Sequence, residues 1–124
     1  MQQSRWLLGE NKTMQVIIFG GSGFLGSWVV TKLIKVGYEV TVFDLNIDKN
    51  LLTKLLGKEI SKIKFITGDI TNYDQVLSSI NNMKYVINLA GLMTPDCSKN
   101  PVLGAQVNII GSINVFEAVK KKDV

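Results

Sequence analysis

Residues 14–30 read MQVIIFGGSGFLGSWVV, and this stretch decides the fold. It places Gly20, Gly21, Gly23 and Gly26 between two apolar runs. A short β-branched run, a glycine cluster and an amphipathic run predict a strand, a tight turn and a helix. In such a unit one glycine permits the turn, one leaves the backbone open to a pyrophosphate, and one lets the helix pack closely. Because the helix N-terminus also offers free N–H groups, the stretch predicts a dinucleotide-binding turn.

Two other interpretations of this turn are disfavoured. Gly21 and Gly26 have the spacing of a P-loop, but Ser27 and Trp28 follow, so the lysine that contacts the phosphates is missing. A turn that binds nothing is the second alternative. Four glycines cost too much chain entropy for a mere connection, which favours a binding role.

The composition excludes several kinds of site. The chain has 124 residues, a net charge of +4, no histidine and one cysteine, Cys97. Disulfides within the chain, Cys/His zinc sites and imidazole-dependent catalytic triads are therefore excluded, no metal is expected, and the simplest compartment is the cytoplasm. The lysines are scattered without interleaved aromatic residues, so no nucleic-acid partner is expected. Glycines and serines dilute the uncharged stretch 13–31, so no membrane span is expected there.

The elements expected along the chain alternate between strand and helix. Strands are predicted at 15–19, 39–44, 62–69 and 84–92, and helices at 24–36, at 48–57, after Thr71 or Asn72, and at 102–122, with a loop from Pro95 to Pro101. Residues 1–13 are expected to be a tail, and residues 14–124 a partial NAD(P)-binding domain. This alternation predicts an α/β fold, a Rossmann-type doubly wound parallel sheet with strand order 3-2-1-4.

Asp44 ends the second predicted strand, twenty-four residues after Gly20. A carboxylate at this place can accept both hydroxyls of the adenosine ribose, and its charge would repel a 2′-phosphate. The only arginine of the chain is Arg5, so no guanidinium is near to accept such a phosphate. NAD is therefore favoured over NADP as the cofactor. The alternative is that Asp44 is a solvated acid at the end of a strand.

FGGSGFLG (19–26) resembles the TGxxGxxG motif of the extended short-chain dehydrogenase/reductases, of the NAD-dependent epimerase/dehydratase type, with Phe19 in place of the threonine. The resemblance spans about residues 14–122. It implies that Gly20, Gly23 and Gly26 are the motif glycines, with Phe24 and Leu25 between the last two. These five residues are candidates for cofactor binding.

Three later segments carry the same resemblance in the same order. TGDITN (67–72) is similar to the turn that holds the adenine, which implies that Asp69 meets the exocyclic amine and Ile70 packs on the ring. NLAGL (88–92) resembles the segment that lines the nicotinamide-side ribose. NIIGSINVFEA (108–118) is similar to the long helix of the family. The cofactor-binding residues implied by the last two segments are Leu89, Ala90, Gly91 and Asn108.

The catalytic pair of that family, a Tyr followed four residues later by a Lys, has no counterpart here. The tyrosines Tyr38, Tyr73 and Tyr85 are followed at that spacing by Val42, Leu77 and Leu89. Ser61 and Lys64 match an S-x-x-K pattern, but they begin a predicted strand, and we interpret the match as chance. We therefore assign no catalytic residue.

The sequence thus predicts the NAD-binding portion of an NAD-dependent epimerase, dehydratase or reductase, without the catalytic half. A nucleotide sugar or related hydroxy or keto metabolite would be the substrate, bound only by a full-length form. The alternatives are a stand-alone, non-catalytic dinucleotide-binding module and a nonfunctional truncated product. A fourth strand without a fifth beside it exposes unpaired backbone groups, which predicts poor solubility or a homodimer through that edge.

Overall fold

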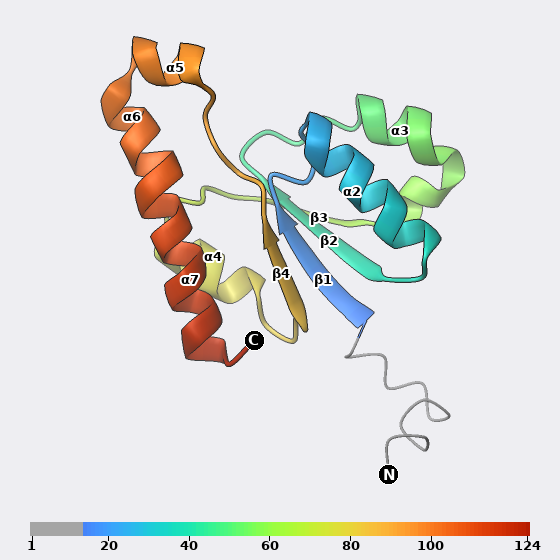
Figure 1. The fold of residues 1–124 in the computed structure, drawn as a ribbon. Coiled ribbons are helices and arrows are strands. Elements are labelled where there is room, and N and C mark those ends of the chain that lie inside the picture. Colours follow the sequence, from blue (N-terminus) through green and yellow to red (C-terminus); the bar gives the residue numbers. More distant parts are fainter. Residues whose placement is uncertain (1–13) are drawn as a thin grey trace.

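The computed structural model describes residues 14–124, and the expected tail, 1–13, lies outside the described residues. Its centre is a parallel sheet with strand order β3-β2-β1-β4, as predicted (Figure 1). The pairing is in register along β1, where Ile17 lies opposite Thr41 on one side and Val86 on the other. The strands are β1 (Gln15–Phe19), β2 (Glu39–Asp44), β3 (Lys64–Thr67) and β4 (Tyr85–Asn88).

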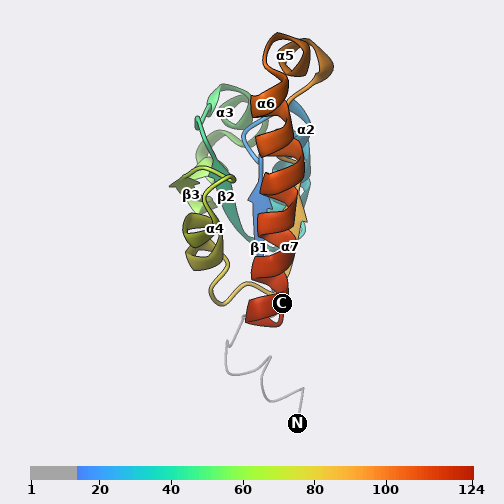
Figure 2. The ribbon, with the colours of Figure 1, turned by 90° about the vertical axis from the view of Figure 1, so that its left-hand side faces the viewer.

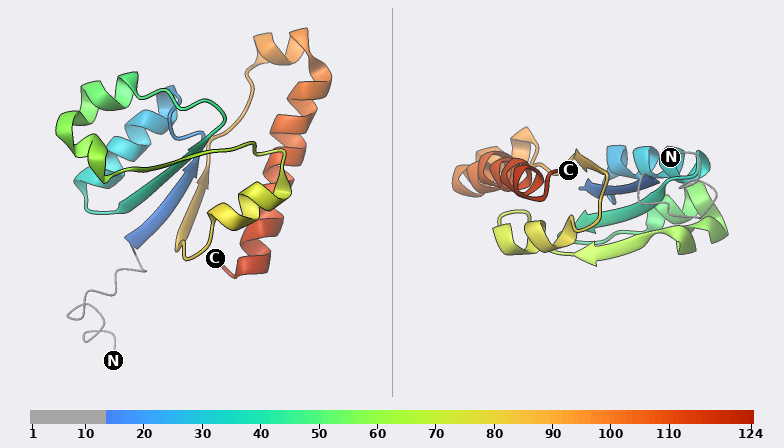
Figure 3. Two further views of the ribbon diagram at one scale, coloured as in Figure 1. Left: turned by 180° about the vertical axis from the view of Figure 1, so that it is seen from behind. Right: turned by 90° about the horizontal axis from the view of Figure 1, so that it is seen from below.

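Helices cover both faces of the sheet. α2 (Phe24–Lys35) and α3 (Asn50–Leu56) lie on one face, and α4 (Tyr73–Ser79) and α7 (Gly111–Lys122) lie on the other (Figures 1 and 3). This arrangement follows from parallel strands, whose crossovers must return over a face of the sheet. The doubly wound Rossmann-type fold is confirmed.

Alternation along β1 divides the core into two halves. Val16 and Ile18 are buried with Val30, Ile34, Leu52 and Leu56 from α2 and α3. Ile17 and Phe19 point to the opposite face and are buried with Val76, Ile80, Val115 and Ala118, which come from α4, the residue after it and α7. Because successive side chains of a strand point to opposite faces, an all-apolar β1 anchors helices on both sides.

Local sequence signals mark several helix ends. Gly37, with φ +96°, follows α2, and its N–H donates to Ile34 O. Asn72 caps α4, because its side chain accepts the N–H of Gln75 at 3.1 Å. Asp48 accepts the N–H of Asn50 at 3.0 Å, but the N-cap of α3 is Lys49, so Asp48 is not its cap. The cations of Lys120, Lys121 and Lys122 occupy the last turn of α7, where the helix dipole favours them.

The predicted loop from Pro95 to Pro101 is wrong, because this segment is mostly helical. α5 (Thr94–Lys99) has Pro95 in its first turn, and α6 (Pro101–Ala105) begins at Pro101. A proline in the first turn does not remove a helical hydrogen bond, so both prolines start helices instead of breaking them. The helix continues through the π-helical segment η3 (Gln106–Ile110) into α7, and Figure 2 shows the resulting rod.

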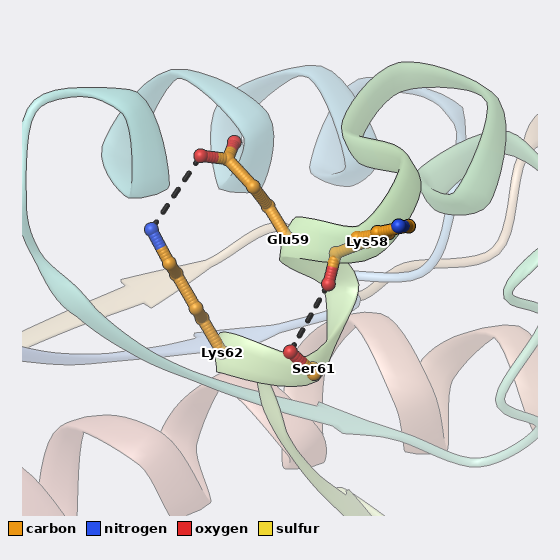
Figure 4. A network of polar contacts seen from close by, with 4 residues as sticks. All are labelled: Lys58, Glu59, Ser61 and Lys62. Carbon is orange, nitrogen blue, oxygen red and sulfur yellow. Dashed lines mark hydrogen bonds and ion pairs between the residues drawn. The ribbon is translucent and has the colours of Figure 1, made fainter.

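The 3-10 helix η2 (Gly57–Lys62) extends α3 beyond its expected end. Ser61 Oγ donates to Lys58 O at 3.0 Å, and Lys62 Nζ lies 3.4 Å from Glu59 Oε1 (Figure 4). An exposed pair of this kind contributes little stability. Ser61 therefore lies in this helix and not at the start of the predicted strand 62–69, because β3 begins only at Lys64.

Among the described residues, one helix, 101–122, is long and apolar enough to cross a membrane by length and composition. Val115 and Ala118 of this helix belong to the core. The core helix of a soluble protein passes the same test, so this finding is weak evidence for a span.

Candidate functional site

A cleft of about 300 Å³ opens at the carboxyl ends of the strands. The chain winds from β1 through β2 to β3 on one side and then returns to place β4 on the other side of β1. Ligands of open α/β sheets bind at such a reversal of strand order. The cleft is lined by Gly20, Gly23, Phe43, Asp44, Leu45, Asn46, Gly68, Asp69, Ile70, Ala90, Gly91, Leu92 and Val107.

The glycine turn begins at Gly20, which has φ +79°. Its N–H donates to Phe43 O at 2.8 Å, which ties the turn to the neighbouring strand β2. On the other side, a Cβ at this position would lie 2.8 Å from Ala90 N. Both the left-handed backbone and this close approach require glycine. Gly20 thus lets β1 turn sharply where its two neighbouring strands end.

Gly26 and Gly23 have different roles in the same turn. A Cβ on Gly26 would collide with Gly20 O and lie 2.7 Å from Gly21 Cα, so Gly26 lets the first turn of α2 pack against the loop. At Gly23 the nearest atom to such a Cβ is Gly20 O at 3.4 Å, and Gly23 lines the cleft. Gly23 is also the N-cap of α2, and no side chain among the described residues caps this helix. The N–H groups of the first turn of α2, which follows Gly23, therefore have no capping side chain and can bind an anion.

Asp44 forms the wall of the cleft at the end of β2. Its Oδ2 accepts Ser22 Oγ at 2.7 Å and Ser22 N at 3.2 Å, and its Oδ1 accepts Leu45 N at 2.9 Å. These bonds stabilise a carboxylate and fix its orientation beside the glycine turn. The arrangement can accept hydroxyl groups of a ligand and disfavours a second anion nearby.

Asp69 and Ile70 line the cleft from the segment after β3. The Oδ1 of Asp69 accepts both Thr71 N at 2.9 Å and Thr71 Oγ1 at 2.7 Å, while Gln75 Oε1 accepts Asp69 N at 2.7 Å. Ile70 is only 7% exposed, and its O accepts Asn114 Nδ2 at 2.9 Å. The segment is therefore held rigidly against α7 and α4.

Asn108, in the π-helical segment, holds the chain that follows β4. Its Oδ1 accepts Leu92 N at 2.7 Å, and its Nδ2 donates to Leu92 O at 2.9 Å. A side-chain amide that bonds both polar groups of one residue acts as a substitute for a neighbouring strand. Asn108 thereby positions the segment of Ala90 and Gly91, although it does not itself line the cleft.

The structure brings seven of the predicted site residues to the cleft: Gly20, Gly23, Asp44, Asp69, Ile70, Ala90 and Gly91. The other five do not line it, and they are Phe24, Leu25, Gly26, Leu89 and Asn108. Phe24 is 78% exposed at the start of α2, whereas Leu89 packs against the core on the α2 face.

Six lining residues were absent from the prediction: Phe43, Leu45, Asn46, Gly68, Leu92 and Val107. All six are one or two positions from a predicted residue. For five of them the place at a strand end was the available signal, and for Val107 it was the neighbouring Asn108 in the helical segment.

Catalytic groups and metal ligands are sparse around this cleft. Between residues 14 and 124 there is no group of three or more His, Cys, Asp and Glu side chains that could hold a metal ion. Tyr38 and Tyr85 pair edge-to-face with ring centroids 6.0 Å apart, in a separate hollow beside β4. The cleft is therefore lined by groups that can bind a ligand, and no tyrosine that could act as a catalytic acid or base lines it.

Comparison with known proteins decides the family. Residues 17–124 match the family model described as GDP-mannose 4,6 dehydratase. The chain belongs to this family. Curated relatives include UDP-glucose 4-epimerases and sterol-4-alpha-carboxylate 3-dehydrogenases, and the resemblance to the NAD-dependent epimerase/dehydratases is confirmed.

Three similar proteins illustrate the match. A bifunctional UDP-glucose 4-epimerase and UDP-xylose 4-epimerase of Arabidopsis thaliana is 30% identical, over 92% of this chain and 35% of its own. The human sterol-4-alpha-carboxylate 3-dehydrogenase, decarboxylating, is 30% identical over 94% of this chain and 28% of its own. The Thermus thermophilus UDP-glucose 4-epimerase, solved in complex with NAD, superposes with a TM-score of 0.74 and 30% identity, covering 90% and 35% of the two chains. The chain thus spans about a third of these relatives.

Proposed function

We propose that this chain binds NAD in the cleft at the ends of β1, β2 and β4. The observation that carries the proposal is the Gly20 turn, which packs against β4 and leads into the uncapped N-terminus of α2 beside the Asp44 carboxylate. The complex of the Thermus thermophilus relative with NAD supports the same cofactor for this family.

The residues of the cleft fit the parts of NAD. The diphosphate would lie beside Gly23, where no side chain is in the way and the N-terminus of α2 favours negative charge. The adenosine ribose would meet Asp44. Asp69 and Ile70 would lie at the adenine, and Ala90 and Gly91 at the nicotinamide-side ribose. Phe24, Leu25 and Gly26 form the first turn of α2, whose backbone would lie beside the diphosphate. Leu89 and Asn108 would support the nicotinamide side, because Leu89 packs on the core and Asn108 holds the segment after β4.

The chain would hold and orient the cofactor, and NAD, when bound, supplies hydride transfer at its nicotinamide. We further propose that the complete protein acts on a hydroxyl or keto group of a nucleotide sugar or a related metabolite. Relatives that are UDP-glucose 4-epimerases and a sterol-4-alpha-carboxylate 3-dehydrogenase support this class of reaction. The cytoplasmic location and the homodimer expected from the sequence stay predictions.

Calorimetry of the 124-residue chain with NAD and NADP tests the binding. We expect NAD to bind and NADP to bind more weakly, and no heat with either at millimolar ligand would refute the proposal. Gly23→Ala is the matched variant, because the added Cβ has an ordinary contact distance of 3.4 Å to Gly20 O but stands where the diphosphate would lie. It should fold and lose affinity. Gly37→Ala, outside the cleft with nothing within 4 Å of the added Cβ, should keep its affinity.

A further inference from the structure

Ser22 connects the two segments that form the cofactor end of the cleft. It lies between Gly21 and Gly23, is only 8% exposed, and does not line the cleft. Its hydroxyl lies 2.7 Å from Asp44 Oδ2 and 3.3 Å from Asn46 O, and it accepts Asp48 N at 3.4 Å. One buried serine therefore bonds the turn after β1 to the segment after β2.

The hydrogen bonds of Asp44 show what this serine controls. A carboxylate has about four acceptor positions, and the protein fills three of them. Ser22 supplies both donors on Oδ2, and Leu45 N supplies the one on Oδ1. Because both oxygens are held, the carboxylate cannot turn without breaking a charge-assisted bond. Oδ1 keeps an acceptor position for a ligand.

We propose that Ser22 is a positioning residue that sets the preference for NAD over NADP through Asp44. This inference rests on the proposed binding of NAD in the cleft. The Ser22 hydroxyl keeps the Asp44 charge at the place where it accepts a 2′-hydroxyl and repels a 2′-phosphate. Without that hydroxyl, only the longer bond from Ser22 N holds Oδ2, and the carboxylate can rotate away from a 2′-phosphate.

The role is separable from folding of the turn. The backbone bonds that close the turn are Gly20 N to Phe43 O at 2.8 Å, Gly23 N to Gly20 O at 3.2 Å and Ser27 N to Gly23 O at 2.8 Å. None of them uses the Ser22 side chain. Loss of its hydroxyl should therefore change which dinucleotide is preferred more than it changes the fold.

The experiment is calorimetry of the full 124-residue chain with NAD and NADP, for Ser22→Ala and for the near-isosteric Ser22→Cys. The quantity compared is the ratio of the two Kd values, NADP over NAD. We expect both variants to lower this ratio by about tenfold, as for loss of one hydrogen bond to a charged group. Ser27→Ala, which removes a buried hydroxyl within α2 that does not contact Asp44, should leave the ratio unchanged.

A double substitution distinguishes positioning of Asp44 from a general disturbance of the binding site. In an Asp44→Ala background, adding Ser22→Ala should leave the ratio unchanged, because the carboxylate that Ser22 holds is gone. An unchanged ratio in folded Ser22→Ala or Ser22→Cys, with NAD still bound by the parent chain, would overturn this inference alone. Failure of the parent chain to bind NAD would overturn the proposed function, and this inference with it.

Discussion

Gly20 and Ala90 approach each other more closely than any side chain at position 20 would allow. A Cβ on Gly20 would lie 2.8 Å from Ala90 N and 2.9 Å from Ala90 Cα, both backbone atoms. This contact joins the turn after β1 to the chain after β4, and both segments line the cleft. The backbone at Gly20 or at Ala90 could move away only if the end of β1 or β4 moved with it.

Gly20→Ala should therefore destabilise the fold by about 2 kcal/mol or more, from the positive φ and the collision together. Urea denaturation measures this loss. Gly37→Ala is the control, because Gly37 also has a positive φ but nothing lies within 4 Å of the added Cβ. Its loss should be about 1 kcal/mol, and an equal loss in the two variants would show that the contact with Ala90 is unimportant.

Asp44→Asn should reduce the discrimination between the two dinucleotides. The amide keeps the shape of the side chain but removes the charge that repels a 2′-phosphate. We expect the affinity for NAD to fall by about tenfold and the affinity for NADP to fall less or to rise. Titration with both ligands measures this. Equal losses for NAD and NADP would mean that Asp44 does not contact the adenosine ribose.

Ser27→Ala should leave the protein as stable or make it more stable by about 1 kcal/mol. Ser27 is completely buried in α2, and its Oγ has no hydrogen-bond partner among the described residues. Alanine removes this unsatisfied group and is the better helix former. Thermal and urea unfolding test it, and a loss of more than about 1 kcal/mol would reveal a partner for the hydroxyl.

Asn108→Asp should loosen the segment after β4. The new carboxylate can still accept Leu92 N, but it cannot donate to Leu92 O and would repel it. We expect a loss of about 1–2 kcal/mol of stability and faster hydrogen exchange at the amides of residues 90–92. Asn108→Ala, which removes both bonds, serves for comparison. Unchanged exchange in both variants would contradict the role of Asn108.

The 124-residue chain should self-associate in solution. Within the described residues β4 is an edge strand, and a hollow of about 820 Å³ lies beside it, lined in part by Val86, Ile87 and Phe116. Unpaired backbone groups beside apolar side chains favour association. Phe116 is 68% exposed, so Phe116→Lys should lower the apparent mass in light scattering without unfolding the chain. A monodisperse parent monomer would contradict the prediction.

The sequence alone determined the order and type of the main elements. Three local patterns predict the first strand, turn and helix: the apolar run of β1, the glycine cluster, and the spacing of apolar residues in α2. Each depends only on residues that are close together in the sequence. The position of Asp44 at the end of a strand could likewise be predicted from the residues next to it. Because parallel strands end at one edge of a sheet, these patterns were enough to gather seven of the twelve predicted residues at the cleft.

Only the tertiary structure decided the rest. The bonds from Ser22 to Asp44 and from Asn108 to Leu92 join residues 22 and 16 positions apart, and no periodicity encodes such pairs. The helix at Thr94–Lys99 was missed because prolines signal both turns and helix starts, and only the packing of the neighbouring segments distinguishes the two. Contacts between side chains on different segments depend on which strands are neighbours in the sheet, so they can be identified only from the tertiary structure.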